Sequence, residues 1–325
     1  LVLRRRVQEV LFTIDEPARE LEILGLALRR MEREKFSSKR LLELQTNLAK
    51  NGKRPSQEIA VFMRLVEYLN QRRNQLLLIV SFPLLWATQF SFAIEAWRRC
   101  CGSDVEAWLE NFGEFEALCA LAGYAYEHPE DPFPEIVEGT TILDGEDLRH
   151  PLLPRSVCVP NSVSLSSDLQ LLLVGGSNMS GKSTLLRTVG INVVLAQAGA
   201  PVRAKHLEVS ILAIGATLRI QDSLQAGVSR FYAEIQRLHD TMELTSGSLP
   251  VLFLLDEILH GTNSHDRVIG AEAIVRGLVE RGAIGLVTTH DLALARVADS
   301  LAPRARNVHF EDHLENGRMT FDYRL

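Results

Sequence analysis

The sequence predicts an α/β domain of mainly parallel strands that follows an all-helical domain. Up to about residue 126, apolar residues recur at the spacing of amphipathic helices. After residue 135, short apolar runs alternate with helical stretches, which is typical of a parallel sheet. Three prolines within residues 128–134 exclude a helix interior and mark the boundary. We therefore expect a helical domain at residues 1–128 and an α/β domain at residues 135–325.

Length and composition agree with two globular domains. The chain has 325 residues, of which 46% are hydrophobic and 23% are charged. Its net charge of -6 means that any contact with nucleic acid needs a local basic patch. The four cysteines lack metal-ligand spacing, and adjacent Cys100 and Cys101 beside a helical stretch favour reduced intracellular thiols. The chain begins with Leu1 and shows no signal peptide, so we expect a cytoplasmic excerpt of a longer protein.

One segment of the helical half leaves an alternative open. Residues 74–94 contain no charged side chain and approach the length of about 20 residues that spans a bilayer. Pro83, Thr88 and Gln89 interrupt the apolar run, and polar residues are costly inside a membrane. We favour a buried helix, with a membrane-associated location as the alternative.

The α/β half opens with a phosphate-binding loop. Residues 176–183 match G-x-x-x-x-G-K-[ST], between an apolar run at 169–174 and a stretch with helical spacing. The glycines let backbone N–H groups face a polyphosphate, and the helix N-terminus adds partial positive charge. Lys182 can reach the β- and γ-phosphates, and the Ser183 hydroxyl can bind Mg²⁺. The expected nucleotide-binding residues are Gly176, Ser177, Asn178, Met179, Ser180, Gly181, Lys182, Ser183 and Thr184.

Two later strands are expected to complete the site. The apolar run 251–255 ends in Asp256, placed to hold Mg²⁺ through water, and Glu257, placed to act as general base. The run 284–288 is followed by His290, which at a strand end could sense the γ-phosphate. At the end of the chain, residues 307–310 and 319–323 flank Asn316-Gly317 and predict a β-hairpin.

These motifs together resemble the ATPase domain of the MutS family of DNA mismatch-repair proteins. The family's distinguishing dipeptide is matched by Asn178-Met179, and residues 261–264 read Gly-Thr-Asn-Ser after the paired carboxylates. Residues 195–204, 215–224 and 229–234 also fit, so the resemblance covers about residues 138–323. It implies a P-loop NTPase of the ABC and MutS type, with the helical region corresponding to the family's core and lever.

The resemblance also implies function. It implies an ATPase that uses ATP and Mg²⁺ and works as a homodimer of facing ATPase domains that acts on DNA. Ser229 would contact the γ-phosphate bound to the partner subunit, and Val159 would flank the adenine. The catalytic residues would be Lys182, Glu257 and His290.

Several departures from the family pattern leave undecided which macromolecule the ATPase acts on, here called its client. Ser177 replaces the usual proline, and Leu259 and His260 replace a Gly-Arg pair. Phe112-Gly113-Glu114 matches the mismatch wedge, but it lies in an amphipathic stretch that predicts a core helix. Paired basic residues along the helices are more often a solvated face than a phosphate contact. The alternatives are a related ATPase that acts on ribosomes or on branched or recombination DNA, and a membrane-tethered scaffold.

Overall fold

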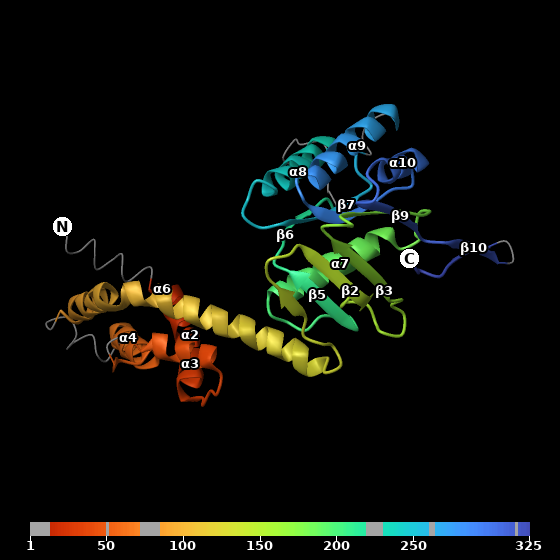
Figure 1. The fold of residues 1–325 in the computed structure, drawn as a ribbon. Coiled ribbons are helices and arrows are strands. Elements are labelled where there is room, and N and C mark those ends of the chain that lie inside the picture. Colours follow the sequence, from red (N-terminus) through yellow and green to blue (C-terminus); the bar gives the residue numbers. More distant parts are fainter. Residues whose placement is uncertain (1–13, 50–51, 72–84, 219–229, 260–263, 316–317) are drawn as a thin grey trace. The chain divides into compact units, whose positions relative to one another are not determined.

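The computed structural model describes residues 14–49, 52–71, 85–218, 230–259, 264–315 and 318–325 (Figure 1). The chain divides into two compact units, Leu1–Ala120 and Leu121–Leu325. The division lies within a long helix that ends just before the proline-rich segment 128–134. Each unit has its own hydrophobic core and is described by itself.

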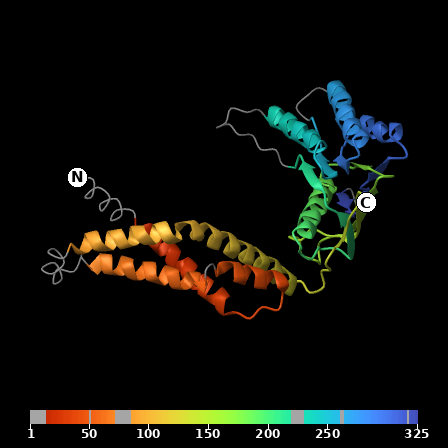
Figure 2. The same cartoon turned by 60° about the vertical axis from the view of Figure 1, so that its left-hand side comes forward.

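The first unit is built from helices in its described part. These helices are α2 (Asp15–Arg33), α3 (Lys39–Leu48), α4 (Pro55–Asn70) and α6 (Trp86–Glu127), whose last residues belong to the second unit. Helix α4 lies alongside α6, where the rings of Phe62 and Trp97 have centroids 4.6 Å apart (Figure 2). Phe112 lies in α6, with its ring centroid 6.3 Å from that of Phe115, so the wedge-like tripeptide is part of a helix.

The uncharged segment at residues 74–94 is only partly described. Residues 74–84 lie outside the described ranges, and α6 begins at Trp86. Within the described ranges, no helix is both long and apolar enough to cross a membrane.

The second unit contains a five-stranded parallel sheet. Both faces of its central strands are buried, because alternate residues of these strands enter different cores. On β4 (Leu171–Gly175), Leu172 and Val174 pack toward α7 (Lys182–Gln197), whereas Leu171 and Leu173 pack toward the cluster that includes α8 (Arg230–Leu244), α9 (Ser264–Glu280) and α10 (Leu292–Ser300) (Figure 1). The strands, in spatial order, are β6 (Ala213–Ala216), β7 (Val251–Asp256), β8 (Ile284–Thr288), β4 (Leu171–Gly175) and β9 (Ala305–His309). The helices are α7 (Lys182–Gln197), α8 (Arg230–Leu244), α9 (Ser264–Glu280) and α10 (Leu292–Ser300).

A second sheet, which the sequence did not predict, covers the other side of α7. Its order is β1 (Glu135–Val137), β5 (His206–Ser210), β2 (Ile142–Leu148) and β3 (Asn161–Ser166). The pairs of β2 with β5 and β3 are antiparallel, so the expectation of one largely parallel sheet was incomplete. The strands were missed because only one face is buried, as in the alternating Val163 and Leu165 of β3.

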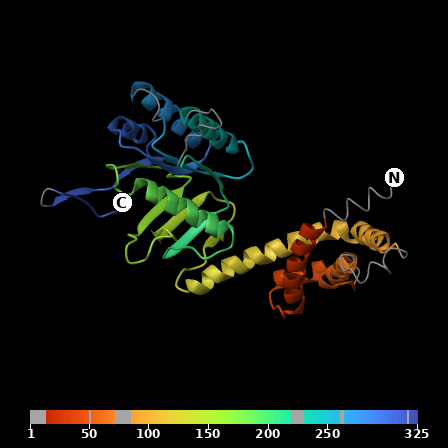
Figure 3. The same cartoon turned by 180° about the vertical axis from the view of Figure 1, so that it is seen from behind.

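The predicted C-terminal hairpin is present, but the residue range predicted for its first strand was wrong. Residues 307–310 begin within β9, which pairs in parallel with β4 at the register Leu173↔Asn307. The hairpin is formed by β10 (Asp312–Glu315) and β11 (Arg318–Phe321), which project from the unit (Figure 3). The turn signal Asn316-Gly317 itself lies outside the described residues. A local turn signal cannot reveal the parallel pairing of β9, because that pairing depends on the crossover through α10.

Candidate functional site

The phosphate-binding loop joins β4 to α7, as its motif predicts. Gly176 and Gly181 have φ values of 144° and 106°, a region that favours glycine. A Cβ atom at Gly176 would lie 2.8 Å from Ser180 Oγ, so this position also needs glycine for space. Ser180 Oγ is buried and has no hydrogen-bond partner among the described residues. The Ser180 hydroxyl of the loop is therefore available to bind a further group.

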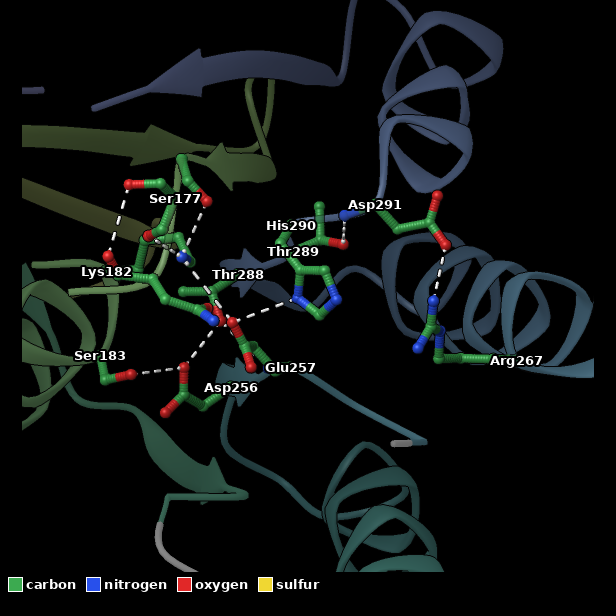
Figure 4. Close-up of polar contacts among 12 residues, drawn as sticks. Ser177, Lys182, Ser183, Asp256, Glu257, Arg267, Thr288, Thr289, His290 and Asp291 are labelled. Carbon is green, nitrogen blue, oxygen red and sulfur yellow. Dashed lines mark hydrogen bonds and ion pairs between the residues drawn. The ribbon is translucent and has the colours of Figure 1, made fainter. Parts of the chain in front are cut away.

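Lys182 is held at the base of this loop. Its side chain is 5% exposed, and Nζ donates hydrogen bonds to the carbonyl oxygens of Gly176 (2.9 Å) and Ser177 (2.6 Å). Nζ also lies 3.7 Å from Glu257 Oε1. A buried ammonium needs such partners, because burying an unpaired charge is costly. The loop thus presents one positive charge where phosphate oxygens are expected (Figure 4).

Asp256 lies at the carboxyl end of β7 and faces the start of α7. Its Oδ1 accepts hydrogen bonds from Ser183 Oγ (2.9 Å) and Thr288 Oγ1 (2.7 Å). Its backbone N–H donates to Thr217 Oγ1 at 3.1 Å, at the end of the neighbouring strand β6. Sequence reasoning had paired Ser183 with Asp256 but had assigned nothing to Thr217 or Thr288, because an isolated threonine carries no motif.

Glu257 has a strained backbone that its neighbours hold in place. Its φ is 47°, in the left-handed region that a glutamate rarely adopts. Its N–H donates to Thr288 Oγ1 at 3.0 Å, and its Oε1 lies 3.4 Å from His290 Nδ1. The structure therefore brings Lys182, Glu257 and His290 together, from three separate parts of the sequence (Figure 4).

A cavity of about 460 Å³ lies at the phosphate-binding loop and the first part of α7. It is lined by the loop, by Glu257 and by mainly apolar residues from other segments. These include the predicted Val159, together with residues that sequence reasoning missed: Leu148, Leu153, Val157, Phe310 and Tyr323.

The C-terminal segment forms part of this wall. Asn161 Nδ2 donates to the carbonyl oxygen of Tyr323 (3.0 Å), and its Oδ1 accepts from the N–H of Leu325 (2.7 Å). Tyr323 lies beside the loop, because a Cβ atom at Gly181 would be 3.2 Å from its ring. The cavity has an aromatic residue although Cys158 stands where the family usually has one. No sequence signal links Tyr323 to a loop about 140 residues earlier.

The segment that carries Val159 is held by polar contacts. Arg155 forms ion pairs with Glu130 (2.9 Å) and with Asp131, whose side chain is fully buried. Tyr124 also donates to Asp131, at 3.0 Å, and burial with this bond raises the pKa of Tyr124 to about 12. At the start of the segment, burial and the nearby Arg187 lower the pKa of His150. His150 Nδ1 accepts a hydrogen bond from the N–H of Leu152 at 3.2 Å.

The residues at the phosphate end fit a magnesium ion. A hydroxyl from Ser183 and a carboxylate from Asp256 are 2.9 Å apart, and hard oxygen ligands of this kind suit Mg²⁺. Among the described residues there is no group of three or more His, Cys, Asp or Glu side chains that could hold a metal. Mg²⁺ commonly binds through one or two protein groups and substrate phosphates, so two ligands agree with that pattern.

Some predicted elements of the site lie outside the described residues. These are Ser229, expected to act across a dimer, and residues 261–263 of the Gly-Thr-Asn-Ser stretch. The neighbouring departure from the family pattern, Leu259, is described and has a φ of 60°. Its N–H donates to the buried carboxylate of Glu234 at 2.5 Å. A residue that replaces glycine here thus keeps a backbone conformation that favours glycine.

Comparison with known proteins finds a family model within this unit and relatives whose matches extend beyond it. A model of MutS domain V matches residues 172–325. The chain is 33% identical over 233 residues to a DNA mismatch repair protein MutS of Shouchella clausii, which covers 67% of this chain and 26% of that protein. It is 35% identical over 178 residues to an endonuclease MutS2 of Thermus thermophilus, covering 53% and 22%. A probable DNA mismatch repair protein Msh6 of Drosophila melanogaster is 29% identical over 249 residues, covering 74% and 20%. The matched part therefore spans about a quarter or less of these relatives.

Proposed function

Since this chain belongs to the MutS family and carries its ATPase-type domain, we propose that it binds ATP with Mg²⁺ and hydrolyses it to ADP and phosphate. One observation carries the proposal. The glycine loop, Asp256 and Glu257 meet at the carboxyl ends of β4 and β7, beside a cavity whose lining is partly apolar. Ligands of open parallel sheets bind at this edge of the sheet.

The phosphate end would bind the charged part of ATP. Backbone N–H groups of residues 176–184 and the N-terminus of α7 supply positive partial charge toward the phosphates. Lys182 Nζ, now bonded to two loop carbonyls, would donate to phosphate oxygens and stabilise the charge that is transferred. Ser183 and Asp256 would hold the Mg²⁺ ion, which neutralises phosphate charge during phosphoryl transfer.

Glu257 and His290 would act on the reacting water and the γ-phosphate. Glu257 is proposed as the general base that accepts a proton from the attacking water. Its Oε1 lies between Lys182 Nζ at 3.7 Å and His290 Nδ1 at 3.4 Å, so its carboxylate is directed to the phosphate end of the cavity. His290 would donate a hydrogen bond to a γ-phosphate oxygen.

The apolar lining of the cavity would take the adenine. Val159 and Tyr323 belong to this lining, and Tyr323 offers a ring face that Cys158 does not. Base stacking on an aromatic ring is tolerant of base identity, so we expect this lining to add affinity more than selectivity.

Dimer formation and a DNA client are also proposed. Two of the relatives named above are DNA mismatch repair proteins, which supports DNA as the client of this chain. In a homodimer of facing ATPase domains, Ser229 would complete the partner subunit's site. The endonuclease MutS2 is not named as a mismatch repair protein, so we keep branched or recombination DNA as the second candidate client of this chain.

The test is the ATPase rate of the chain and of Glu257→Gln. Loss of a general base lowers a rate by about 10²- to 10⁴-fold, so hydrolysis should fall by at least about 100-fold while ATP binding persists. Glu280→Gln, at the exposed last residue of α9, is the matched control and should match the wild type.

The client is tested by adding DNA to the same assay. Homoduplex, mismatched and branched DNA are compared at two salt concentrations, because phosphate contacts weaken as salt rises. Stimulation by one of these DNAs supports a DNA client and identifies the preferred structure. A rate that depends on Glu257 but ignores every DNA would contradict the DNA proposal and leave the ATPase intact.

A further inference from the structure

An ion pair outside the phosphate-binding machinery connects two segments of the site. Arg267, in the first turn of α9, donates from Nη2 to Asp291 Oδ2 at 2.8 Å. Both side chains are mostly covered, at 20% and 21% exposure, so solvent screens this pair less than a surface pair. Figure 4 shows Arg267 reaching from its helix to the residue that follows His290.

The position of Arg267 in its helix is unfavourable unless it has a partner. The N-terminal turn of a helix carries partial positive charge, so a cation there is repelled. Asp266 supplies negative charge in the same turn, and Asp291 supplies it from another element. The pair with Asp291 thus offsets this repulsion and also forms a tether between α9 and the residues after β8.

The tether completes the anchoring of the turn that carries His290. Thr288 is bonded to Asp256, and the N–H of Thr289 donates to the carbonyl oxygen of Val174 in β4 at 3.0 Å. The N–H of Asp291 donates to Thr289 Oγ1 at 2.9 Å. The residues on both sides of the histidine are thus bonded to β4, β7 or α9.

His290 is carried by this turn. Its side chain is 41% exposed, and its Nδ1 lies 3.4 Å from Glu257 Oε1. Arg267 and His290 line the same small cavity of about 10 Å³ beside Glu257. The backbone that carries the imidazole is therefore held next to Glu257 by a turn that Arg267 anchors through Asp291.

We propose that Arg267 and Asp291 are positioning residues that keep His290 directed at Glu257 and so set the rate of ATP hydrolysis, with little effect on ATP affinity. The inference rests on the proposed ATPase function. Arg267 also follows the segment that leaves Glu257, so the pair ties together the chain after β7 and the chain after β8. A misplacement of about 1 Å at a reacting group can lower a rate by about 100-fold.

The test compares Arg267→Gln, Asp291→Asn and the double variant in the full chain. We expect kcat to fall about tenfold in each single variant, with KM for ATP and the Kd for a fluorescent ATP analogue within about twofold of wild type. Because the two side chains act as one unit, the double variant should be no slower than the slower single variant. Arg267→Lys keeps the charge and should recover part of the rate.

Arg276→Gln is the matched control. Arg276 lies on the same helix and pairs with Glu272 at 2.7 Å, with both side chains about 40% exposed. Its removal should leave kcat unchanged.

Several outcomes would overturn the inference. They are a kcat within twofold of wild type in Arg267→Gln, losses that add in the double variant, and a fall in ATP affinity that matches the fall in kcat. If Arg267→Gln does not fold, the kcat and the ATP affinity of Asp291→Asn decide: a kcat within twofold of wild type, or an equal fall in affinity, overturns the inference. A wild-type chain without Glu257-dependent hydrolysis would refute the proposed function itself, whereas an active chain indifferent to Arg267 would refute the inference alone.

Discussion

The hydroxyl of Thr288 connects the metal side of the site to the general base, and its removal should damage both stability and hydrolysis. Thr288 is fully buried at the end of β8. It donates to Asp256 Oδ1 at 2.7 Å and accepts from the N–H of Glu257 at 3.0 Å. Thr288→Val keeps the branched shape of the side chain and removes both bonds.

The expected loss of stability follows from these two bonds. A hydrogen bond to a charged group contributes about 1.5–3 kcal/mol and an ordinary one about 0.5–1.5 kcal/mol. We therefore expect Thr288→Val to lower the free energy of unfolding by about 2–4 kcal/mol. Urea unfolding, with an unchanged m-value, measures this change.

The expected loss of activity follows from the backbone of Glu257. A residue in the left-handed region costs of order 1–3 kcal/mol and persists only where its surroundings hold it. Without the Thr288 hydroxyl, the backbone of Glu257 (φ 47°) loses one of the contacts that hold it. Its carboxylate can then turn away from Lys182 and His290. We expect kcat for ATP to fall about tenfold or more.

Thr288→Ser is the control, because it keeps the hydroxyl and loses one methyl group. It should retain most of the activity and lose only about 1 kcal/mol of stability. If Thr288→Val unfolds at the same urea concentration as wild type and hydrolyses ATP at the same rate, the reasoning about this hydroxyl is refuted.

Two further predictions concern packing and pH. Gly285→Ala should lower stability by about 3 kcal/mol or more, because its Cβ atom would lie 2.1 Å from the carbonyl oxygen of Phe253 in the adjacent strand β7. Gly113→Ala in α6, with nothing within 4 Å, is the control and should not destabilise. His150 has a lowered pKa in the folded protein, so its contribution to stability is present above the unfolded value of about 6.5 and is lost as pH falls. His150→Asn can still accept the bond from the N–H of Leu152, so urea unfolding from pH 7.5 to 5 should show a smaller decrease in stability than wild type.

The local parts of the site were predictable from the sequence. The strand, glycine loop and helix around Lys182 are contiguous in the sequence. The φ values at Gly176 and Gly181 are positive, which favours glycine. The strands that end at Asp256 and Thr288 are fully buried apolar runs, so hydropathy alone placed them. Parallel order then brings their ends to one edge of the sheet, which is why Ser183 and Asp256 could be paired in advance.

Other residues of the site carry no local signal. Thr217, Thr288 and Tyr323 are ordinary residues in the sequence, and each acquires its contacts through strand order or chain return. The mixed sheet beside α7 was missed because its short, half-buried strands have weak patterns. The pair of Arg267 with Asp291 joins positions 24 residues apart on different elements, which no periodicity reveals.

The sequence by itself determined the chemistry: a phosphate loop, two carboxylates after one buried strand and a histidine after another. These depend on neighbours along the chain, where backbone conformation and side-chain period act over a few residues. Tertiary structure alone decided how the carboxylates are held, which apolar residues line the cavity and which ion pair anchors the turn that carries His290. Those features arise from contacts between distant segments, and their geometry exists only once the sheets and helices have packed together.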